Sequence, residues 1–171
     1  LRARIWLAIL TAALAVTPLY GTGPARAAFP GVNGPIVFTH EAPAGDHTQS
    51  DVYVLDAGAD SPRRLTGTPN RNEFGPSWSP DAARIACWRT KAPFGPGSLW
   101  VMDADGRNKR QLTHGFDARD PAWDPAGRRL VFTAARKNGD TFDLWTIRVS
   151  DGALRRLTRD PRRAATASRR E

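Results

Sequence analysis

The chain has 171 residues, a single cysteine and a formal net charge of +8 at pH 7. One cysteine, Cys87, excludes an intrachain disulfide. The excess charge lies at the ends: three basic residues precede Ala28 and seven follow Leu154, which leaves 15 basic and 15 acidic residues between them. A protein that reads nucleic acid needs a basic face on its folded part, so this neutral body argues against that class of function.

Residues 1–27 have the pattern of a secretory signal peptide. Arg2 and Arg4 precede the apolar run Ile5–Val16, and Ala25-Arg26-Ala27 supplies the small residues of a cleavage site before Ala28. The alternative is a membrane anchor, but the run of 12 residues is shorter than the roughly 20 that a spanning helix needs. We therefore expect export, without a stable membrane anchor after cleavage.

After the signal region, the same short sequence words recur in fixed order at offsets of 45 to 49 residues. Each unit holds an apolar run, then a run centred on an aromatic residue, then a basic residue shortly before Leu-Thr. The apolar runs are Ile36–Thr39, Ile85–Trp88 and Leu130–Thr133, the aromatic residues are Tyr53, Trp100 and Trp145, and the Leu-Thr pairs begin at Leu65, Leu112 and Leu157. Such a period indicates stacked structural units that bury their apolar faces against one another.

Within each unit, the apolar runs are bounded by turn residues and predict short antiparallel strands. In the second unit we expect strands over Gly75–Trp78, Arg84–Arg89, Ser98–Asp103 and Lys109–Thr113, with a hairpin turn at Asp105-Gly106. In the first unit, residues 41–50 read as a long loop. Four antiparallel strands in about 45 residues predict an all-β fold of β-propeller blades. A β-sandwich or barrel also has short strands, but neither requires these words at constant phase.

We place three blades at residues 34–66, 73–113 and 120–158, followed by an Arg-rich disordered tail over 159–171. Aromatic residues at the repeated positions should pack between blades as the structural core of the repeat. These are Trp78, Trp88, Trp100, Trp123, Phe132 and Trp145.

Three words of the second unit closely resemble the repeat of TolB-like β-propellers. They are Trp78-Ser79-Pro80-Asp81, Leu99–Gly106 and Arg110-Gln111-Leu112-Thr113. The resemblance covers about residues 29–158 and implies an exported bacterial protein, periplasmic or extracellular, with WD40-like blades. Blades of this kind occur in Tol-system components and in substrate-gating domains of peptidases. The expected function is a non-catalytic module that binds an unidentified protein or peptide. The alternative is the N-terminal propeller of a longer exported hydrolase, prolyl-peptidase-like or lactonase-like.

The repeat is incomplete at both ends. The first unit starts at Ile36, in what should be its second strand, and in the resembled family the C-terminus supplies the missing first strand. The first strands of the other two units contain Pro-x-Trp, as Pro76-Ser77-Trp78 and Pro121-Ala122-Trp123, but the next such position reads Thr166-Ala167-Ser168-Arg169. Closed propellers use about four to eight blades. The chain is therefore either a truncated gene product or an open arc that associates through its open blade edges.

The sequence contains no evident catalytic set, and we expect no enzyme activity, cofactor or metal. Cys87 lies in an apolar run without an adjacent histidine, because His40, His47 and His114 are expected in loops or turns of other units. Asp103-Ala104-Asp105-Gly106 resembles the start of a calcium loop but lacks the closing Glu, so we interpret it as a hairpin turn. The acids Asp117, Asp120 and Asp124 are expected to bind turn amides.

Overall fold

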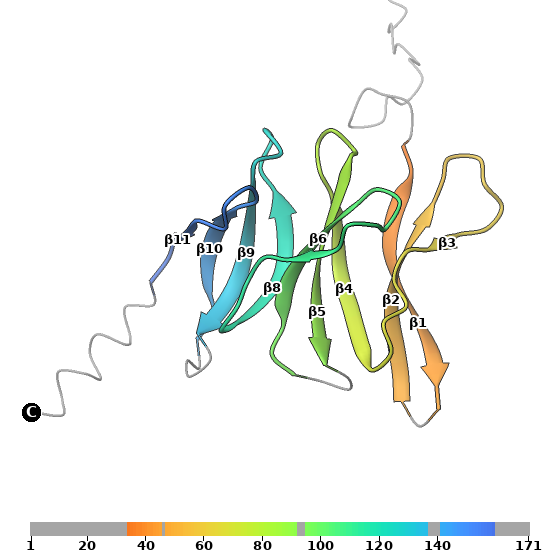
Figure 1. The fold of residues 1–171 in the computed structure, drawn as a ribbon, viewed down its shortest axis with the longest axis horizontal. Coiled ribbons are helices and arrows are strands. Elements are labelled where there is room, and N and C mark those ends of the chain that lie inside the picture. Colours follow the sequence, from red (N-terminus) through yellow and green to blue (C-terminus); the bar gives the residue numbers. More distant parts are fainter. Residues whose placement is uncertain (1–33, 46, 92–94, 137–140, 160–171) are drawn as a thin grey trace, which may run out of the picture. The chain divides into compact units, whose positions relative to one another are not determined.

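The computed structural model describes residues 34–45, 47–91, 95–136 and 141–159. Within these residues the structure is all-β, with eleven strands in three antiparallel sheets and no helix (Figure 1). Among the described residues there is no helix that could cross a membrane. The predicted signal peptide and all but the first residue of the Arg-rich tail lie outside the described residues.

Each sheet is a meander in which consecutive strands are neighbours, and each corresponds to one predicted repeat unit. Sheet A contains β1 (Ile36–Ala44), β2 (His47–Leu55) and β3 (Arg63–Arg64). Sheet B contains β4 (Arg71–Trp78), β5 (Arg84–Lys91), β6 (Ser98–Asp103) and β7 (Arg110–Gln111). Sheet C contains β8 (Phe116–Trp123), β9 (Arg129–Arg136), β10 (Asp143–Arg148) and β11 (Leu154–Arg156). The predicted four-stranded antiparallel unit is confirmed in sheets B and C.

Sheet A lacks a counterpart of β4 and β8 among the described residues, as expected from the sequence. Within them, β1 pairs only with β2, so its other edge is open. The prediction of a loop over residues 41–50 is wrong, because this segment forms the arms of a hairpin in which Ala44 pairs with His47. Pro43 lies in β1, where a strand at the edge of a sheet tolerates a residue without an N–H.

The first strands of sheets B and C begin earlier than predicted because each continues through a bulge. The pairing of β4 with β5 shifts register between Phe74 and Ser77, and the pairing of β8 with β9 shifts between Arg119 and Ala122. Gly75 has a φ of 55° and Asp120 a φ of 53° at these sites. A bulge bends a strand without ending it, so the residues before Gly75 remain part of β4.

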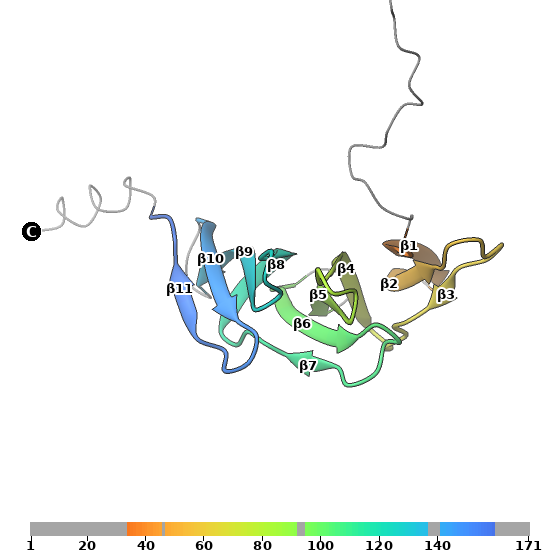
Figure 2. The same ribbon diagram turned by 90° about the horizontal axis from the view of Figure 1, so that it is seen from above.

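Two apolar clusters join the sheets in pairs. One contains Val52 and Val54 of sheet A together with Ile85, Cys87 and Met102 of sheet B. The other contains Leu99 and Val101 of sheet B together with Leu130, Phe132 and Ile147 of sheet C. Strand β4 contacts β1 and β2, and β8 contacts β4, β5 and β6, so each first strand lies against the preceding sheet (Figure 2). The three described sheets do not close a ring.

Candidate functional site

The recurring Leu-Thr pair connects the outer strand of each blade to the neighbouring strand through hydrogen bonds. In every sheet the threonine hydroxyl accepts a hydrogen bond from the N–H of a third-strand residue, and the preceding leucine N–H donates to that residue's carbonyl. The N–H to hydroxyl distances are 2.9 Å for Val52 to Thr66, Leu99 to Thr113 and Leu144 to Thr158. The word therefore recurs because each blade uses the same side chain to extend a very short strand.

In sheets A and C an acid two residues before the repeated aromatic residue completes this arrangement, Asp51 on β2 and Asp143 on β10. Arg64 Nη2 lies 2.5 Å from Asp51 Oδ2, and Arg156 forms the corresponding ion pair with Asp143. Sheet B uses neutral residues, since Ser98 replaces the acid and Gln111 donates to the Thr113 carbonyl at 2.7 Å. Sequence reasoning noticed the basic residues and missed the acids. The signal was present, because each acid precedes the third-strand aromatic residue by two positions.

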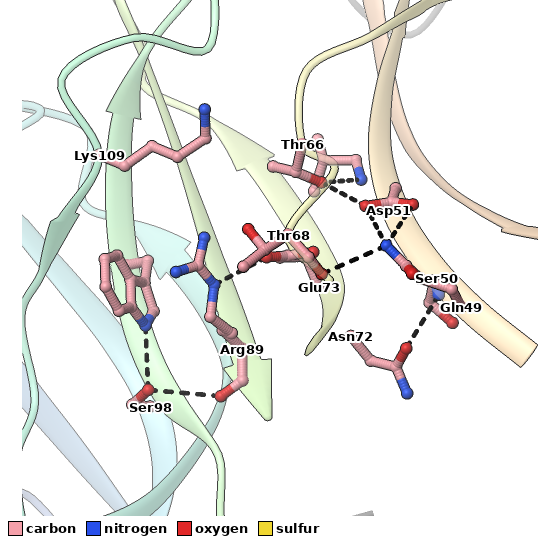
Figure 3. A network of polar contacts seen from close by, with 12 residues as sticks. Gln49, Ser50, Asp51, Thr66, Thr68, Asn72, Glu73, Arg89, Ser98 and Lys109 are labelled. Atoms are coloured by element: carbon pink, nitrogen blue, oxygen red, sulfur yellow. Dashed lines mark hydrogen bonds and ion pairs between the residues drawn. The ribbon is translucent and has the colours of Figure 1, made fainter. Parts of the chain in front are cut away.

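A buried ion pair lies between sheets A and B (Figure 3). Glu73 on β4 has no exposed surface, and its Oε1 lies 2.7 Å from Arg89 Nε on β5. Burial raises the pKa of Glu73 and Asp51 raises it further, while the charge of Arg89 and a hydrogen bond from Thr68 oppose them. The Arg89 guanidinium lies 4.0 Å from the centre of the Trp100 ring. Because solvent does not reach the carboxylate, we interpret this pair as structural rather than catalytic.

The structure places all six predicted core aromatic residues at the clusters between sheets. Phe132 and Trp145 are almost fully buried between sheets B and C. Trp88 and Trp123 pack against the same cluster, and Trp78 and Trp100 pack against the cluster between sheets A and B.

Trp88 lies on the opposite face of β5 from Cys87. Cys87 pairs with Trp100 as Phe132 pairs with Trp145, which agrees with the alignment of the apolar runs, where Cys87 and Phe132 share a position. Successive side chains of a strand point to opposite faces, so Cys87 belongs to the cluster between sheets A and B while Trp88 packs against the cluster between sheets B and C. There its ring stacks on Phe74, with 4.7 Å between ring centroids.

Cys87 is a buried apolar residue of β5, as predicted. Its side chain is 3% exposed, and burial raises the pKa of the thiol to about 12. His40 lies on β1 and His47 on β2, so their assignment to loops is wrong. The His40 ring lies 5.1 Å from the Tyr53 ring, which gives it a packing contact in sheet A.

Of the acids considered for metal binding, Asp105, Asp117 and Asp124 accept hydrogen bonds from backbone amides. Asp124 Oδ1 accepts hydrogen bonds from the Arg128 and Arg129 amides, and Asp105 accepts one from the Arg107 amide. Asp117 Oδ1 accepts from the Gly97 amide at 2.7 Å. Within the described residues, no group of three or more His, Cys, Asp or Glu side chains could hold a metal ion. The expectation that these acids accept hydrogen bonds from amides is thus confirmed for Asp117 and Asp124.

Two tryptophans at the same repeat position differ in their hydrogen bonds. Trp123 Nε1 donates to the Ser77 carbonyl of β4 at 3.0 Å, which ties sheet C to the first strand of sheet B. Trp78 faces sheet A, where no such strand is described. Its Nε1 atom is buried and has no hydrogen-bond partner within the described residues. By analogy with Trp123, the acceptor of Trp78 would belong to a strand added at the open edge of β1.

The far face of sheet C is uncovered in the described structure. Leu144 and Leu157 are 41% and 47% exposed, whereas their counterparts Leu99 and Leu112 in sheet B are 0% and 7% exposed. In sheet B these positions are covered by sheet C. The exposed leucines therefore form an apolar surface, the sheet C face, that has the composition of an interface between blades.

Antiparallel sheets of three or four strands repeat along the described chain and pack against one another, and each holds its outer strand through the same hydrogen bonds. These features define the protein as a set of β-propeller blades. No sequence-family model matches the chain. It is 38% identical over 74 residues to Tol-Pal system protein TolB 1 of Novosphingobium aromaticivorans, an alignment that covers 43% of this chain and 16% of that relative. The structure of TolB from Acinetobacter baumannii superimposes with a TM-score of 0.60 at 22% identity, over 74% of this chain and 31% of that one.

The chain is thus a TolB-like β-propeller segment, and it spans only a small part of the length of the curated relatives that it matches. The same fold occurs in enzymes. The acylaminoacyl peptidase of Pyrococcus horikoshii superimposes with a TM-score of 0.58 at 12% identity, over 77% of this chain and 24% of that one. At such identities the structural similarity establishes the fold alone.

Proposed function

We propose that this chain is an exported, non-catalytic β-propeller module that binds protein, with an extended strand of the partner pairing along the open edge of β1. The observation that carries the proposal is the buried Trp78 N–H, which has no acceptor within the described residues although its counterpart in Trp123 has one. The similarity to a Tol-Pal system protein supports a role in a protein assembly.

The physical argument rests on unsatisfied backbone and side-chain groups. An open strand edge presents unpaired N–H and C=O groups, which recruit a further strand. Ile36, at the start of β1, is 61% exposed and would be covered by that strand. A carbonyl of the added strand would take the place that the Ser77 carbonyl has for Trp123. The added strand would therefore satisfy a donor that costs about 1–3 kcal/mol when buried alone.

Matched Trp→Phe variants test this interpretation. Tagged full chain would be used to capture partners from the exported fraction, and each purified partner would be titrated against wild type, Trp78→Phe and Trp123→Phe. We expect Trp78→Phe to weaken binding about tenfold without the loss of melting temperature expected for Trp123→Phe, because it removes a donor that has no acceptor among the described residues of the unbound chain. Trp123→Phe should lower the melting temperature, because it leaves the Ser77 carbonyl unsatisfied.

Two outcomes would contradict the proposal. One is the absence of any partner combined with a compact, soluble monomer at all concentrations in sedimentation experiments. The other is a Trp78→Phe variant that loses stability as Trp123→Phe does while binding unchanged. Concentration-dependent self-association abolished by Trp78→Phe would instead identify a second copy of the chain as the partner.

Export is the second part of the proposal and has its own test. The pattern of residues 1–27 predicts cleavage before Ala28. Mass spectrometry of the exported protein should therefore find Ala28 as the first residue. Protein that keeps Arg2 or Ile5 would instead indicate a membrane anchor.

The alternative function is the propeller of a longer exported hydrolase, since the same fold also occurs in a peptidase. The coding sequence downstream of residue 171, read in all three frames, distinguishes the two. Further blades alone support the binding module. Blades followed by Gly-x-Ser-x-Gly support a peptidase, because that turn carries the nucleophile of such enzymes.

A further inference from the structure

A pocket rich in arginine lies where sheets B and C meet at their turns. Its volume is about 620 Å³, within the range of small-molecule sites. Sheet B contributes the start of β5 and the short β7, and sheet C contributes the β8–β9 turn and the end of β10. The charged residues of the lining are Arg84, Arg110, Arg128, Arg129, Arg148 and Asp124.

Three of these guanidinium groups are held in place by the protein. Arg84 Nη2 donates to the Gly127 carbonyl at 2.8 Å and its guanidinium lies 4.8 Å from the centre of the Trp123 ring. Arg110 Nη2 donates to the Val149 carbonyl at 2.5 Å, and Arg148 pairs with Asp151 at 2.6 Å. A guanidinium has five N–H donors, so each retains donors beyond these contacts. Binding an anion would then cost little side-chain ordering.

The balance of charge in the pocket is strongly positive. Five arginines line it against one carboxylate, Asp124, whose pKa is lowered by the amide hydrogen bonds from Arg129 and Arg128. Asp124 therefore stays ionised and offsets one positive charge, and Asp151, which pairs with Arg148, offsets another. The body of the chain is neutral overall, so this concentration of arginine is local. Clefts lined by one sign of charge concentrate ligands of the opposite sign.

We propose that this pocket binds a ligand with two or more phosphate groups. Guanidinium groups pair with phosphate oxygens through two parallel hydrogen bonds, and several fixed groups suit a multiply charged anion better than a single carboxylate. The volume accommodates more than one phosphate. The ligand is either a free phosphate compound or the headgroup of an anionic phospholipid, since both present the same chemistry. The proposal is independent of the protein-binding function.

Inorganic tripolyphosphate is the first probe, titrated by calorimetry into the full chain with citrate as a carboxylate of similar charge. We expect one saturable site for tripolyphosphate and weaker binding of citrate. Arg110→Gln and Arg129→Gln should each weaken tripolyphosphate binding about tenfold, the loss expected for one charged hydrogen-bonding group. Arg63→Gln is the matched control, because Arg63 lies on β3 at the position of Arg110 but outside the pocket.

The Arg-rich tail needs a second control, since it also attracts anions. The double variant Arg169→Gln and Arg170→Gln should leave the affinity for tripolyphosphate within twofold of wild type. Vesicles with and without phosphatidylglycerol form the lipid arm: binding that requires the anionic lipid and is lost in Arg129→Gln would assign the site to a headgroup and support the proposal.

Three results would overturn it. One is tripolyphosphate binding that falls as much in Arg63→Gln or in the tail variant as in Arg110→Gln. Another is citrate binding as tightly as tripolyphosphate. The last is a DNA oligonucleotide that binds more tightly than tripolyphosphate, which would indicate a nucleic-acid surface in place of a small phosphate site. Circular dichroism and melting curves of each variant would confirm that the fold is retained.

Discussion

Leu99 and Leu144 occupy the same position in consecutive blades and differ in what covers them. Each donates its N–H to the threonine that fastens the outer strand of its own sheet, so their backbone environments match. Leu99 is fully buried between sheets B and C, whereas Leu144 is 41% exposed on the sheet C face. Replacing each leucine by alanine therefore compares a position that is buried between two blades with the equivalent position on an uncovered blade face.

The two substitutions should differ several-fold in their cost. Leu99→Ala removes buried atoms and leaves a cavity, a change that destabilises proteins by about 3–5 kcal/mol. Leu144→Ala loses only part of the roughly 1.5–3 kcal/mol that full burial of a leucine gives, and it leaves no enclosed cavity. We expect a cost of about 1 kcal/mol for Leu144→Ala.

Urea denaturation of the full chain, followed by tryptophan fluorescence and circular dichroism, measures both free energies of unfolding. The slopes with urea should stay equal to that of wild type, so that midpoints can be compared directly. Equal costs for the two substitutions would refute the reasoning, because sheet C would then not pack on Leu99 as described, or Leu144 would be covered in solution.

Other substitutions probe the core, the buried ion pair and the thiol. Trp100→Ala and Trp145→Ala should each lower the free energy of unfolding by about 3–5 kcal/mol in chemical denaturation, because both aromatic rings pack between sheets; costs within error of zero would contradict the blade assignment. The raised pKa of Glu73 means that the folded state binds its proton more tightly, so its contribution to stability is present at low pH and is lost as pH rises from the ordinary carboxyl pKa through the raised one. Glu73→Gln should remove this loss of stability at rising pH. Melting temperatures of wild type and variant, compared from pH 4 to 8, would measure it. Cys87, with a thiol pKa of about 12, should react with a thiol reagent at pH 8 only after denaturant is added; rapid reaction of the native protein would indicate an accessible thiol.

The blade architecture could be predicted from the sequence because the same motifs occur three times in the same order. A single Leu-Thr pair does not indicate a structure, but three pairs at constant spacing indicate that the same hydrogen-bonding arrangement forms three times. The span of β6, Ser98–Asp103, was predicted correctly, because apolar residues fill the strand and turn residues bound it. The buried state of Cys87 followed from the same pattern.

Errors occurred where the repeats differ from one another. The hairpin of β1 and β2 is rich in polar residues, and its long arms are possible because β1 has an open edge, a property of the sheet and not of its residues. The first half of β4 was missed for another reason, because the bulge at Gly75 interrupts the register and the residues before it looked like a turn.

The arginine pocket could not be predicted from the sequence, because its members come from different parts of two repeat units. Arg84 begins a second strand, Arg110 lies on a fourth strand and Arg148 ends a third strand. Along the chain these arginines are separated by acids, so the sequence reads as neutral. The turns of adjacent sheets bring them together, and the carbonyls of Gly127 and Val149 orient two of them across the boundary between sheets. The pocket thus forms only where two units stack, and neither unit alone contains it.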